Sequence, residues 1–315
     1  MDLTMKDSNP VLIVENLAKI YQSAPPFTAV NSISFVLDAG EILGFLGPNG
    51  AGKTTTIQML LGVMRPTSGK ITYFGKDFAQ HRSAIMQHVS FASAYVQLPG
   101  HLTIAENLNF YGELYGISKI ERTAKIKELL TFFGMWDQRN KRTGEISAGQ
   151  MTRVILCKAF LVEPKIVLLD EPTASLDPDI VVEVRSFVLQ QRKERGISVL
   201  FTSHNMADVA TVCDRVLILK NGSIIADNTP EQLAQSVAKA KVELVISEGL
   251  EIAEHYAREQ NLYYQRKEHQ TIEITTDEHK IAELLMGLAR RQVIYSQISI
   301  AKPTLEDYFI TIAKK

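Results

Sequence analysis

The first part of the chain carries apolar residues in two recurring patterns, one typical of strands and one of helices. Short apolar runs predict buried strands at 11–14, 33–37, 41–46, 165–169 and 197–202. Apolar residues three and four positions apart predict helices at 54–62, 104–114, 120–133 and 180–195. Asn221-Gly222, between apolar runs at 215–219 and 223–227, predicts a β-hairpin. Strands that alternate with helices favour an α/β core with a largely parallel sheet.

The pattern changes after about residue 235. Thr229 and Pro230 predict the start of a helix, as N-cap and first helical residue. The expected elements after it are a strand, a helix, one or two strands, a helix, a strand and a last helix, at 242–246, 250–260, 263–276, 279–291, 293–300 and 304–313. A β-α-β-β-α-β order is typical of a ferredoxin-like α+β domain. We therefore expect two domains, 1–235, with a mostly helical subdomain at about 100–160, and 236–315.

Composition excludes several classes of function. The 315 residues are 45% hydrophobic, and 34 basic against 35 acidic residues give a net charge of −1. A protein whose main partner is nucleic acid usually carries a basic surface, which this balance does not favour. No stretch approaches the ~18 apolar residues of a spanning helix, and the first residues do not read as a secretory signal. Cys157 and Cys213 form no CxxC pair, so we expect buried thiols in a reducing cytosol.

A glycine-rich loop from Gly47 to Thr54 lies between a predicted strand and a predicted helix. Glycines let consecutive backbone N–H groups turn toward one anion, and the helix that follows directs its positive end there. Lys53 can reach the β- and γ-phosphates of a nucleotide, and the Thr54 hydroxyl can bind Mg²⁺. This order of strand, loop and helix predicts a P-loop.

Two carboxylates follow the predicted strand at 166–169. Asp170, at the tip of a strand beside the P-loop strand, can hold a magnesium ion through its water shell. The adjacent Glu171 can orient or deprotonate an attacking water. A third feature, Ser147-Ala148-Gly149-Gln150, begins a predicted helix and is another anion cradle, although a weak signal by itself.

Together these segments resemble the ATP-binding subunits of ABC transporters. Gly47–Thr54 matches the Walker A motif, 166–170 the Walker B motif, and Glu171 the catalytic glutamate. Residues 146–150 resemble the family signature, 175–177 the D-loop with Asp177, and His204 the switch histidine. Tyr21 matches the aromatic residue on which adenine stacks. The matching motifs cover residues 11–227 in the family's order.

The resemblance implies a P-loop NTPase fold of ABC type and a head-to-tail dimer. Each ATP would lie between the P-loop of one subunit and the signature of the other, so Ser147, Ala148, Gly149 and Gln150 would complete the partner's site. Glu171 would polarise water and His204 would contact the γ-phosphate. The implied ATP-binding residues are Tyr21, Gly47, Pro48, Asn49, Gly50, Ala51, Gly52, Lys53, Thr54 and Thr55. Thr54 and Asp170 would hold Mg²⁺.

Two positions depart from the family pattern. Ala148 stands where the signature usually has glycine, and its methyl group narrows the approach to phosphate. At the Q-loop, Ala94 stands where the family has glutamine, and Gln97 comes three residues late. Either a remodelled loop lets Gln97 serve, or Ser93 or water takes that place at the metal.

The sequence leaves three functions open. The leading interpretation is an ATP hydrolase that drives export through a separate permease, because 303–309 resembles the closing motif of such exporter ATPases. We then expect a cytoplasmic subunit held at the inner face of the cell membrane by the permease. The alternatives are a soluble ABC ATPase that acts on ribosomes or DNA, and a weakly hydrolysing regulatory subunit that senses nucleotide. Near-neutral charge argues against the nucleic-acid alternative.

Overall fold

The computed structural model describes residues 9–93, 96–174, 176–237 and 239–313, and it divides the chain into two compact units. The first unit ends at Pro230 and the second begins at Glu231. The boundary expected near residue 235 therefore falls inside the helix α8 (Pro230–Val237). None of the described helices combines the length and apolarity needed to cross a bilayer.

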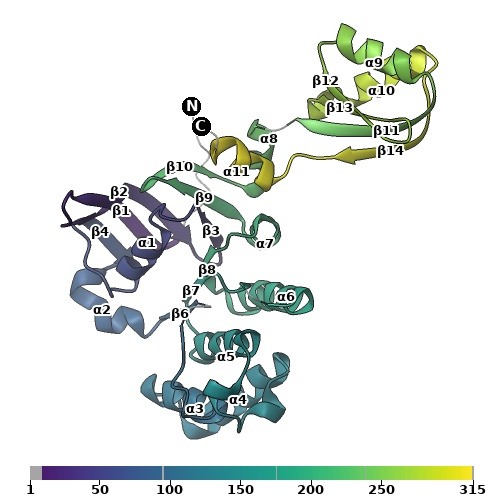
Figure 1. The fold of residues 1–315 in the computed structure, drawn as a ribbon. Helices are drawn as coiled ribbons and strands as arrows, with labels where there is room; N and C mark the ends of the chain where they lie inside the picture. The colour runs from purple at the N-terminus through teal and green to yellow at the C-terminus, as the bar shows by residue number, and fades with distance from the viewer. Residues whose placement is uncertain (1–8, 94–95, 175, 238, 314–315) are drawn as a thin grey trace. The chain divides into compact units, whose positions relative to one another are not determined.

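Two sheets build the first unit (Figure 1). An antiparallel sheet has the order β2-β1-β4-β5, from β2 (Phe27–Asp38), β1 (Pro10–Tyr21), β4 (Ser68–Tyr73) and β5 (Lys76–Asp77). A mixed sheet has the order β10-β9-β3-β8-β7-β6, from β10 (Ser223–Asn228), β9 (Arg215–Lys220), β3 (Ile42–Leu46), β8 (Ser198–Thr202), β7 (Ile166–Asp170) and β6 (Val89–Ser93). The predicted α/β core is confirmed.

Helices pack on both sheets and also form a separate helical part. The first group comprises α1 (Lys53–Leu60), α2 (Phe78–Met86), α6 (Pro178–Arg195) and α7 (Met206–Val212). The helical part comprises α3 (Ile104–Leu114), α4 (Lys119–Phe132) and α5 (Ala148–Leu161), which pack on one another (Figure 1). Short 3₁₀ turns at Trp136–Gln138 and Thr143–Glu145 join α4 to α5. Thr103 and Glu106 cap α3 reciprocally, which fixes where that helix begins.

The central strands explain why the sequence shows unbroken apolar runs. Every residue of β3, β7 and β8 is buried, because helices or sheet cover both faces. These strands run parallel, with Ile42 opposite Val199 and Ile166 opposite Ser198. Their carboxyl ends therefore meet at one edge of the sheet, where ligands bind in open α/β sheets.

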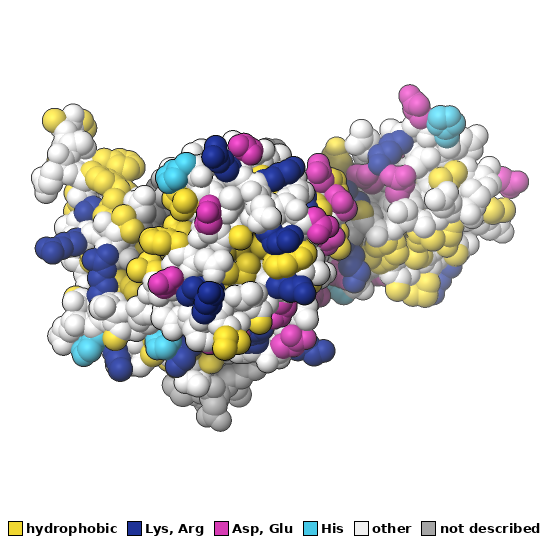
Figure 2. Space-filling view, turned by 90° about the horizontal axis from the view of Figure 1, so that it is seen from below, with side chains coloured by type: hydrophobic (Ala, Val, Ile, Leu, Met, Phe, Trp, Pro, Cys, Tyr) yellow, Lys and Arg dark blue, Asp and Glu magenta, His cyan; other side chains and the backbone are white. Residues whose placement is uncertain are grey.

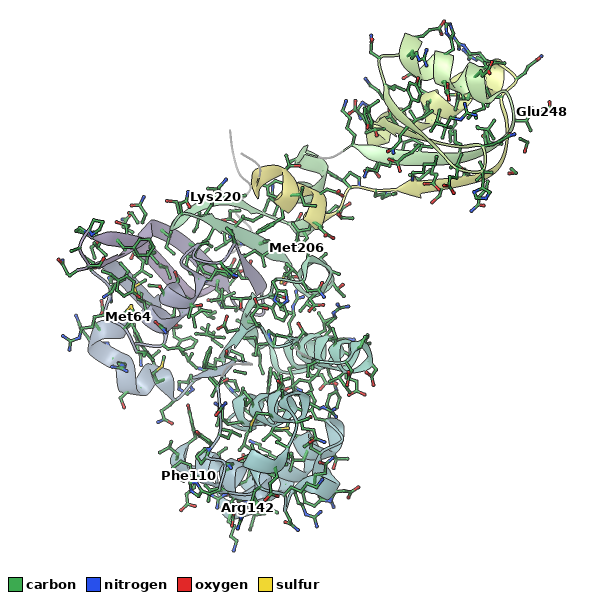
Figure 3. The ribbon with its side chains drawn as sticks, viewed as in Figure 1. Met64, Phe110, Arg142, Met206, Lys220 and Glu248 are labelled. Carbon is green, nitrogen blue, oxygen red and sulfur yellow. The ribbon has the colours of Figure 1, made fainter. Side chains whose placement is uncertain are left out.

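The second unit has the expected element order. Its strands are β11 (Ala240–Glu248), β12 (Tyr263–Lys267), β13 (Thr271–Thr276) and β14 (Ile294–Ala301), and its helices are α8, α9 (Leu250–Glu259), α10 (Ile281–Arg290) and α11 (Leu305–Ala313). A 3₁₀ turn at Glu278–Lys280 precedes α10. The sheet is antiparallel with the order β12-β13-β11-β14. Its core joins Val242, Leu244 and Ile246 of β11 to residues of α9 and α10. Figure 3 shows the side chains of both units.

Candidate ATP-binding site

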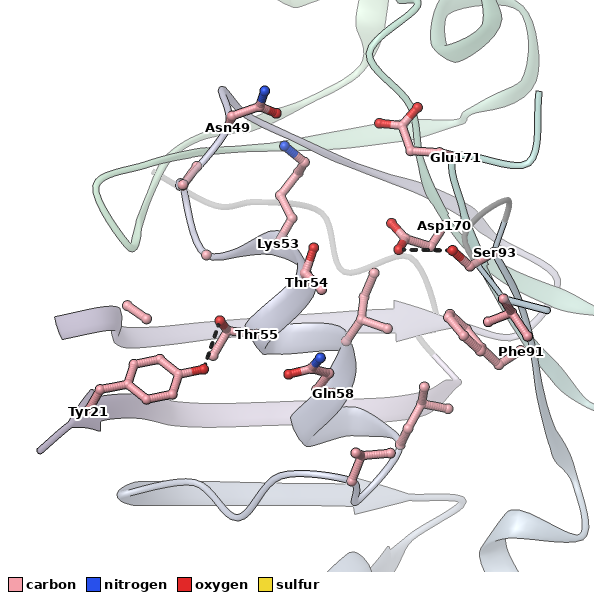
Figure 4. Close-up of a pocket in the computed structure, with 18 of the residues that line it drawn as sticks. Tyr21, Asn49, Lys53, Thr54, Thr55, Gln58, Phe91, Ser93, Asp170 and Glu171 are labelled. Carbon is pink, nitrogen blue, oxygen red and sulfur yellow. Dashed lines mark hydrogen bonds between the residues drawn. The ribbon is translucent and has the colours of Figure 1, made fainter. Parts of the chain in front are cut away.

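A cavity of about 700 Å³ opens at the carboxyl ends of the central strands (Figure 4). Its lining includes Tyr21, Asn49, Lys53, Thr54, Asp170 and Glu171. They come from three segments that lie far apart in the sequence, and the sheet topology brings these segments together. The cavity therefore joins the P-loop, the aromatic residue and both carboxylates that the sequence singled out.

The P-loop connects the end of β3 at Leu46 to the start of α1 at Lys53. Gly52 has φ +102°, and a Cβ added there would lie 2.4 Å from the carbonyl oxygen of Ala29. No side chain fits at that distance, so glycine is required both by conformation and by space. The backbone of β2 thus forms the rear wall of the loop.

The β9–β10 hairpin also supports the P-loop. The Gly222 amide donates to the carbonyl oxygen of Ala51 at 3.2 Å, and the Asn31 amide donates to the carbonyl oxygen of Gly222 at 2.8 Å. Asn221 and Gly222 have φ +49° and +77°, the values of the predicted tight turn. The hairpin predicted from Asn221-Gly222 is confirmed, and its tip joins the P-loop to β2.

Lys53 projects along the loop toward the cavity. Its Nζ donates to the carbonyl oxygens of Gly47 at 2.5 Å and Pro48 at 3.2 Å. Burial lowers the pKa of Lys53, and the nearby carboxylates of Glu171 and Asp170 partly offset that effect. The cavity thus contains one cationic side chain beside two carboxylates. The lysine can bind a phosphate, and the carboxylates can bind a divalent cation.

Asp170 is nearly buried and is held by two hydroxyl groups. Thr202 Oγ1 donates to Asp170 Oδ1 at 2.7 Å, and Ser93 Oγ donates to Oδ2 at 3.5 Å. Figure 4 shows the side chains of Asp170 and Thr54 directed into the cavity. Among the described residues, no three His, Cys, Asp or Glu side chains gather as a metal-binding group. The carboxylate of Asp170 and the hydroxyl of Thr54 are oxygen donors that fit Mg²⁺, which takes one or two protein oxygens and completes its shell with water and phosphate.

Glu171 and His204 lie in direct contact. His204 Nδ1 is 2.6 Å from Glu171 Oε2, and the His204 amide donates to the same oxygen at 3.2 Å. The Glu171 amide is itself bound by Thr202, and its backbone has φ +54°, uncommon for a residue with a side chain. The structure thus brings together the two residues that the sequence named as catalytic.

Tyr21 ends β1 beside the P-loop. Its hydroxyl lies 3.5 Å from Thr55 Oγ1, and its ring lines the cavity. Phe27, which pairs with Tyr21 across β1 and β2, also lines the cavity and is 55% exposed. The sequence analysis missed Phe27, although an aromatic residue directly after Pro25-Pro26 in a polar segment was a usable signal.

The signature segment lies elsewhere in the chain. Ser147 is the N-cap of α5, accepting a hydrogen bond from the Gln150 amide at 3.2 Å, while Gln150 Oε1 accepts from the Ser147 amide at 3.1 Å. Ser147 and Ala148 are exposed, and neither they nor Gly149 belong to the lining of the P-loop cavity. The two segments for which the sequence predicts anion binding therefore lie at separate places in one chain.

Comparisons with known proteins extend these observations. The family model described as ABC transporter matches residues 30–174. The uncharacterized ABC transporter ATP-binding protein YxlF of Bacillus subtilis (strain 168) is 33% identical over 303 residues, which cover 96% of this chain and 99% of that protein. The chain belongs to the ATP-binding subunits of ABC transporters. It is an ATP-hydrolysing transport ATPase.

Two further relatives of this ABC ATPase have names that refer to different processes, resistance and import. The linearmycin resistance ATP-binding protein LnrL of Bacillus subtilis (strain 168) is 30% identical over 96% of this chain and 98% of its own length. The methionine import ATP-binding protein MetN of Latilactobacillus sakei is 30% identical over 94% of this chain and 88% of its own length. A solved structure of an ATP binding subunit of an ABC transporter has a TM-score of 0.67 at 28% identity, covering 71% of this chain and 92% of that one.

Asp177 and Gln97, which the sequence analysis discussed for the D-loop and the Q-loop, both lie outside the cavity lining. Asp177 is the N-cap residue of α6, and its side chain makes no capping hydrogen bond. Gln97 is exposed and lies outside the cavity lining, whereas Ser93 lines the cavity and contacts Asp170. Ala94 lies outside the described residues.

A buried ionic group behind the site was not foreseen from the sequence. Asp208 of α7 is fully buried and accepts hydrogen bonds from Thr173, in the loop after Glu171, and from Arg185 of α6. It thus connects the segment after Glu171 to the segment after His204. In the sequence, Asp208 reads as an ordinary polar residue of a short helix, and no spacing reveals its partners.

Proposed function

We propose that this ABC ATPase works as a pair of ATP-binding subunits that drives export through a separate membrane permease. The observation that carries the proposal is the separation of the two anion cradles. The P-loop, Asp170 and Glu171 share one cavity, whereas Ser147 lies outside it. A second copy that supplied its Ser147 and Gly149 would close that cavity over ATP.

Each residue has a role in such a composite site. The P-loop amides and Lys53 hold the β- and γ-phosphates. Tyr21 and Phe27 offer aromatic surface to adenine. Mg²⁺, held by Thr54 and Asp170, would neutralise charge that develops on the phosphates.

Hydrolysis depends on the contact between Glu171 and His204. Glu171 accepts a proton from, or orients, the water that attacks the γ-phosphate. His204 fixes the position of that carboxylate through its ring and its amide, both bound to Oε2. His204 is 75% exposed, so it can also reach a γ-phosphate at the closing interface.

The export direction rests on resemblance. The segment 303–309 resembles the closing motif of exporter ATPases with separate permeases, and the relative LnrL is named for linearmycin resistance. We further propose that the C-terminal unit is a ferredoxin-like domain, since its order β12-β13-β11-β14 is that of a split β-α-β pair. The subunit would lie in the cytoplasm, at the inner face of the cell membrane. With the permease in proteoliposomes and the ATPase outward, an exporter accumulates its cargo in the lumen.

A mixing experiment tests the composite site. Lys53→Ala removes the P-loop function of one copy, and Ser147→Arg blocks the signature of the other. Each variant alone should show no Mg²⁺-dependent ATP hydrolysis, because both of its sites are broken. A 1:1 mixture should recover about a quarter of wild-type activity, since half the pairs are mixed and each has one intact site.

Glu171→Gln tests the proposed catalytic role of Glu171 separately. It should lower turnover by roughly 100-fold or more while ATP still binds, because only the acceptor of the water proton is lost. Glu194→Gln, an exposed carboxyl of α6 outside the cavity lining, is the control and should leave turnover unchanged. Failure of the mixture to regain activity would exclude the composite site even if Glu171→Gln behaves as expected.

A further inference from the structure

Asp208 is a buried carboxylate behind the ATP-binding cavity, and the proposed function gives it no role. Figure 2 shows acidic and basic side chains interspersed on one face of the chain, where water solvates them. Asp208, by contrast, is 0% exposed. A buried charge strongly destabilises a fold unless partners satisfy it. The partners of Asp208 therefore show which parts of the chain the carboxylate holds together.

Each oxygen of the Asp208 carboxylate has one side-chain partner. Thr173 Oγ1 donates to Oδ2, and the guanidinium of Arg185 donates to Oδ1. Arg185 lies on α6 and supplies the opposite charge, whereas Thr173 is buried and uncharged. Since Arg185 alone balances the charge, the bond from Thr173 adds position and not neutrality. Asp208 therefore fixes the place of Thr173.

Thr173 belongs to a tight turn that begins at Glu171. The Ala174 amide donates to the carbonyl oxygen of Glu171 at 3.1 Å, which closes the turn. On its other side, the Glu171 amide donates to the carbonyl oxygen and to Oγ1 of Thr202, each at 3.1 Å. Glu171 has φ +54°, a conformation that a residue with a side chain keeps only where its surroundings impose it. Holding Thr173 thus helps to hold the backbone of Glu171.

The other side of Asp208 is tied to His204. Asp208 lies in the first turn of α7, and Asn205 is the N-cap of that helix. Asn205 Oδ1 accepts hydrogen bonds from the amides of Ala207 at 3.0 Å and Asp208 at 3.4 Å. His204 directly precedes this cap, and its amide and Nδ1 both contact Glu171 Oε2. The first turn of α7 therefore links the place of Asp208 to that of His204.

These contacts form a closed ring. From Glu171 it follows the turn to Thr173 and crosses to Asp208. From there it follows the first turn of α7 to His204 and returns to Glu171 Oε2. We propose that Asp208 is a positioning residue for ATP hydrolysis, which acts through Thr173 to fix the carboxylate of Glu171. This rests on the proposed function, in which Glu171 binds the water that attacks the γ-phosphate.

The ring should affect turnover and not ATP binding. Asp208 and Thr173 lie outside the lining of the ATP-binding cavity, whereas Glu171 belongs to it. A catalytic base must lie within hydrogen-bond reach of the proton that it accepts, so a small displacement of its carboxylate slows the reaction. The P-loop keeps its own supports on β2 and the β9–β10 hairpin.

Thr173→Val is the most direct test, because valine has nearly the shape of threonine but lacks the hydroxyl. The ion pair of Asp208 with Arg185 is kept. In the full chain, kcat of ATP hydrolysis should fall about tenfold, while KM and the ATP affinity from calorimetry stay within twofold of wild type. Thr173→Ser, which keeps the donor, should retain kcat within twofold. Unchanged kcat in Thr173→Val would overturn the inference.

Ser198→Ala is the matched control for loss of a buried hydroxyl. Ser198 is 1% exposed, begins β8 at the opposite end from Thr202, and accepts a hydrogen bond from the Gly40 amide at 2.9 Å. It should lower the urea midpoint of unfolding, as Thr173→Val does, but leave kcat unchanged. An equal fall of kcat in both variants would mean that lost stability and not lost position is responsible, which also overturns the inference.

A Glu171→Gln background shows whether the effect passes through Glu171. In single-turnover assays, adding Thr173→Val should slow the residual hydrolysis less than twofold, because the carboxylate that it positions is already gone. A further tenfold loss would exclude this route. Wild-type turnover by Glu171→Gln alone would refute the proposed catalytic role of Glu171 and this inference with it, whereas unchanged kcat in Thr173→Val refutes the inference alone.

Asp208→Asn tests the carboxylate itself. It should lower kcat at least as much as Thr173→Val, and the double variant should be no slower than Asp208→Asn alone, since both changes break the same hydrogen bond. Circular dichroism shows whether this variant folds, and Thr173→Val decides the matter if it does not. Additive losses in the folded double variant would overturn the inference.

Discussion

Gly222→Ala should weaken both the fold and nucleotide binding, because Gly222 joins the P-loop to β2. At φ +77° an alanine costs about 1–2 kcal/mol of unfolding free energy relative to ordinary backbone. Its Cβ would also lie 2.9 Å from the carbonyl oxygen of Ala29, closer than real contacts, and 3.2 Å from the Asn31 amide nitrogen. Relief requires backbone movement, and overpacking of this kind costs about 1–3 kcal/mol. We expect a total loss of about 3 kcal/mol.

Gly40→Ala separates the cost of placing alanine at positive φ from the cost of the close contact. Gly40 has φ +69°, nearly the same conformation, but nothing lies within 4 Å of an added Cβ. Gly40→Ala should lower the free energy of unfolding by only about 1 kcal/mol. Replacing glycine also reduces the conformational entropy of the unfolded chain, but this effect is the same in both variants and cancels when they are compared.

The assay is urea unfolding of both variants, combined with ATP affinity by calorimetry. Gly222→Ala should also weaken ATP binding roughly threefold or more, about 0.7 kcal/mol, since its amide holds Ala51 in the P-loop. Gly40→Ala should leave affinity unchanged. Equal losses of stability in the two variants, with ATP affinity intact in both, would refute the reasoning.

Two further predictions concern the anion cradles. Burial lowers the pKa of Lys53 in the folded protein below the ordinary value near 10.4. Between these two pKa values the unfolded chain binds more protons than the folded protein. The free energy of unfolding therefore rises with pH in this range. The unfolding free energy of wild type should therefore rise relative to Lys53→Met as pH goes from 8 to about 10 in urea titrations; a pH-independent difference would contradict the assignment. Ser147→Ala removes the N-cap of α5 and should cost about 1 kcal/mol together with most of the ATPase activity, whereas Ser147→Thr should retain both. Hydrolysis by Ser147→Ala at the wild-type rate would exclude a role for that hydroxyl at the partner's phosphate.

Strong periodicity and turn chemistry made much of the fold predictable. The helix α3 begins and ends at the expected residues, because Thr103 and Glu106 form a capping box in front of regular apolar spacing. The buried runs of β7 and β8 were found for a similar reason, since strands covered on both faces read as continuous apolar segments.

Elements with weak local signals were missed. The strands β4 and β5, the helices α2 and α7, and the strand β6 were not foreseen. The strand β4 is mostly exposed at its start and contains Gly69, so its pairing with β1 decides its conformation rather than its own residues. The strand β6 depends on β7, to which it pairs along its whole length. Tertiary contacts supply what local sequence lacks.

The candidate site was predictable only where its chemistry is local in sequence. The P-loop and the Asp170-Glu171 pair are continuous segments, so sequence identified them. Phe27 reaches the cavity only through its pairing with Tyr21, and Asp208 is buried by packing of three separate elements. Such residues gain their roles from topology, which spacing along the chain does not report.

The contact between Gly222 and Ala51 also bears on how the protein is made. The P-loop is synthesised early, but the hairpin that supports it is among the last segments of its unit to be translated. A nascent chain whose β9 and β10 segments have not yet emerged from the ribosome lacks this support. Nucleotide can therefore stabilise the folding chain only near the end of synthesis of the first unit. Because this contact joins distant parts of the chain, its formation should be a slow step of folding.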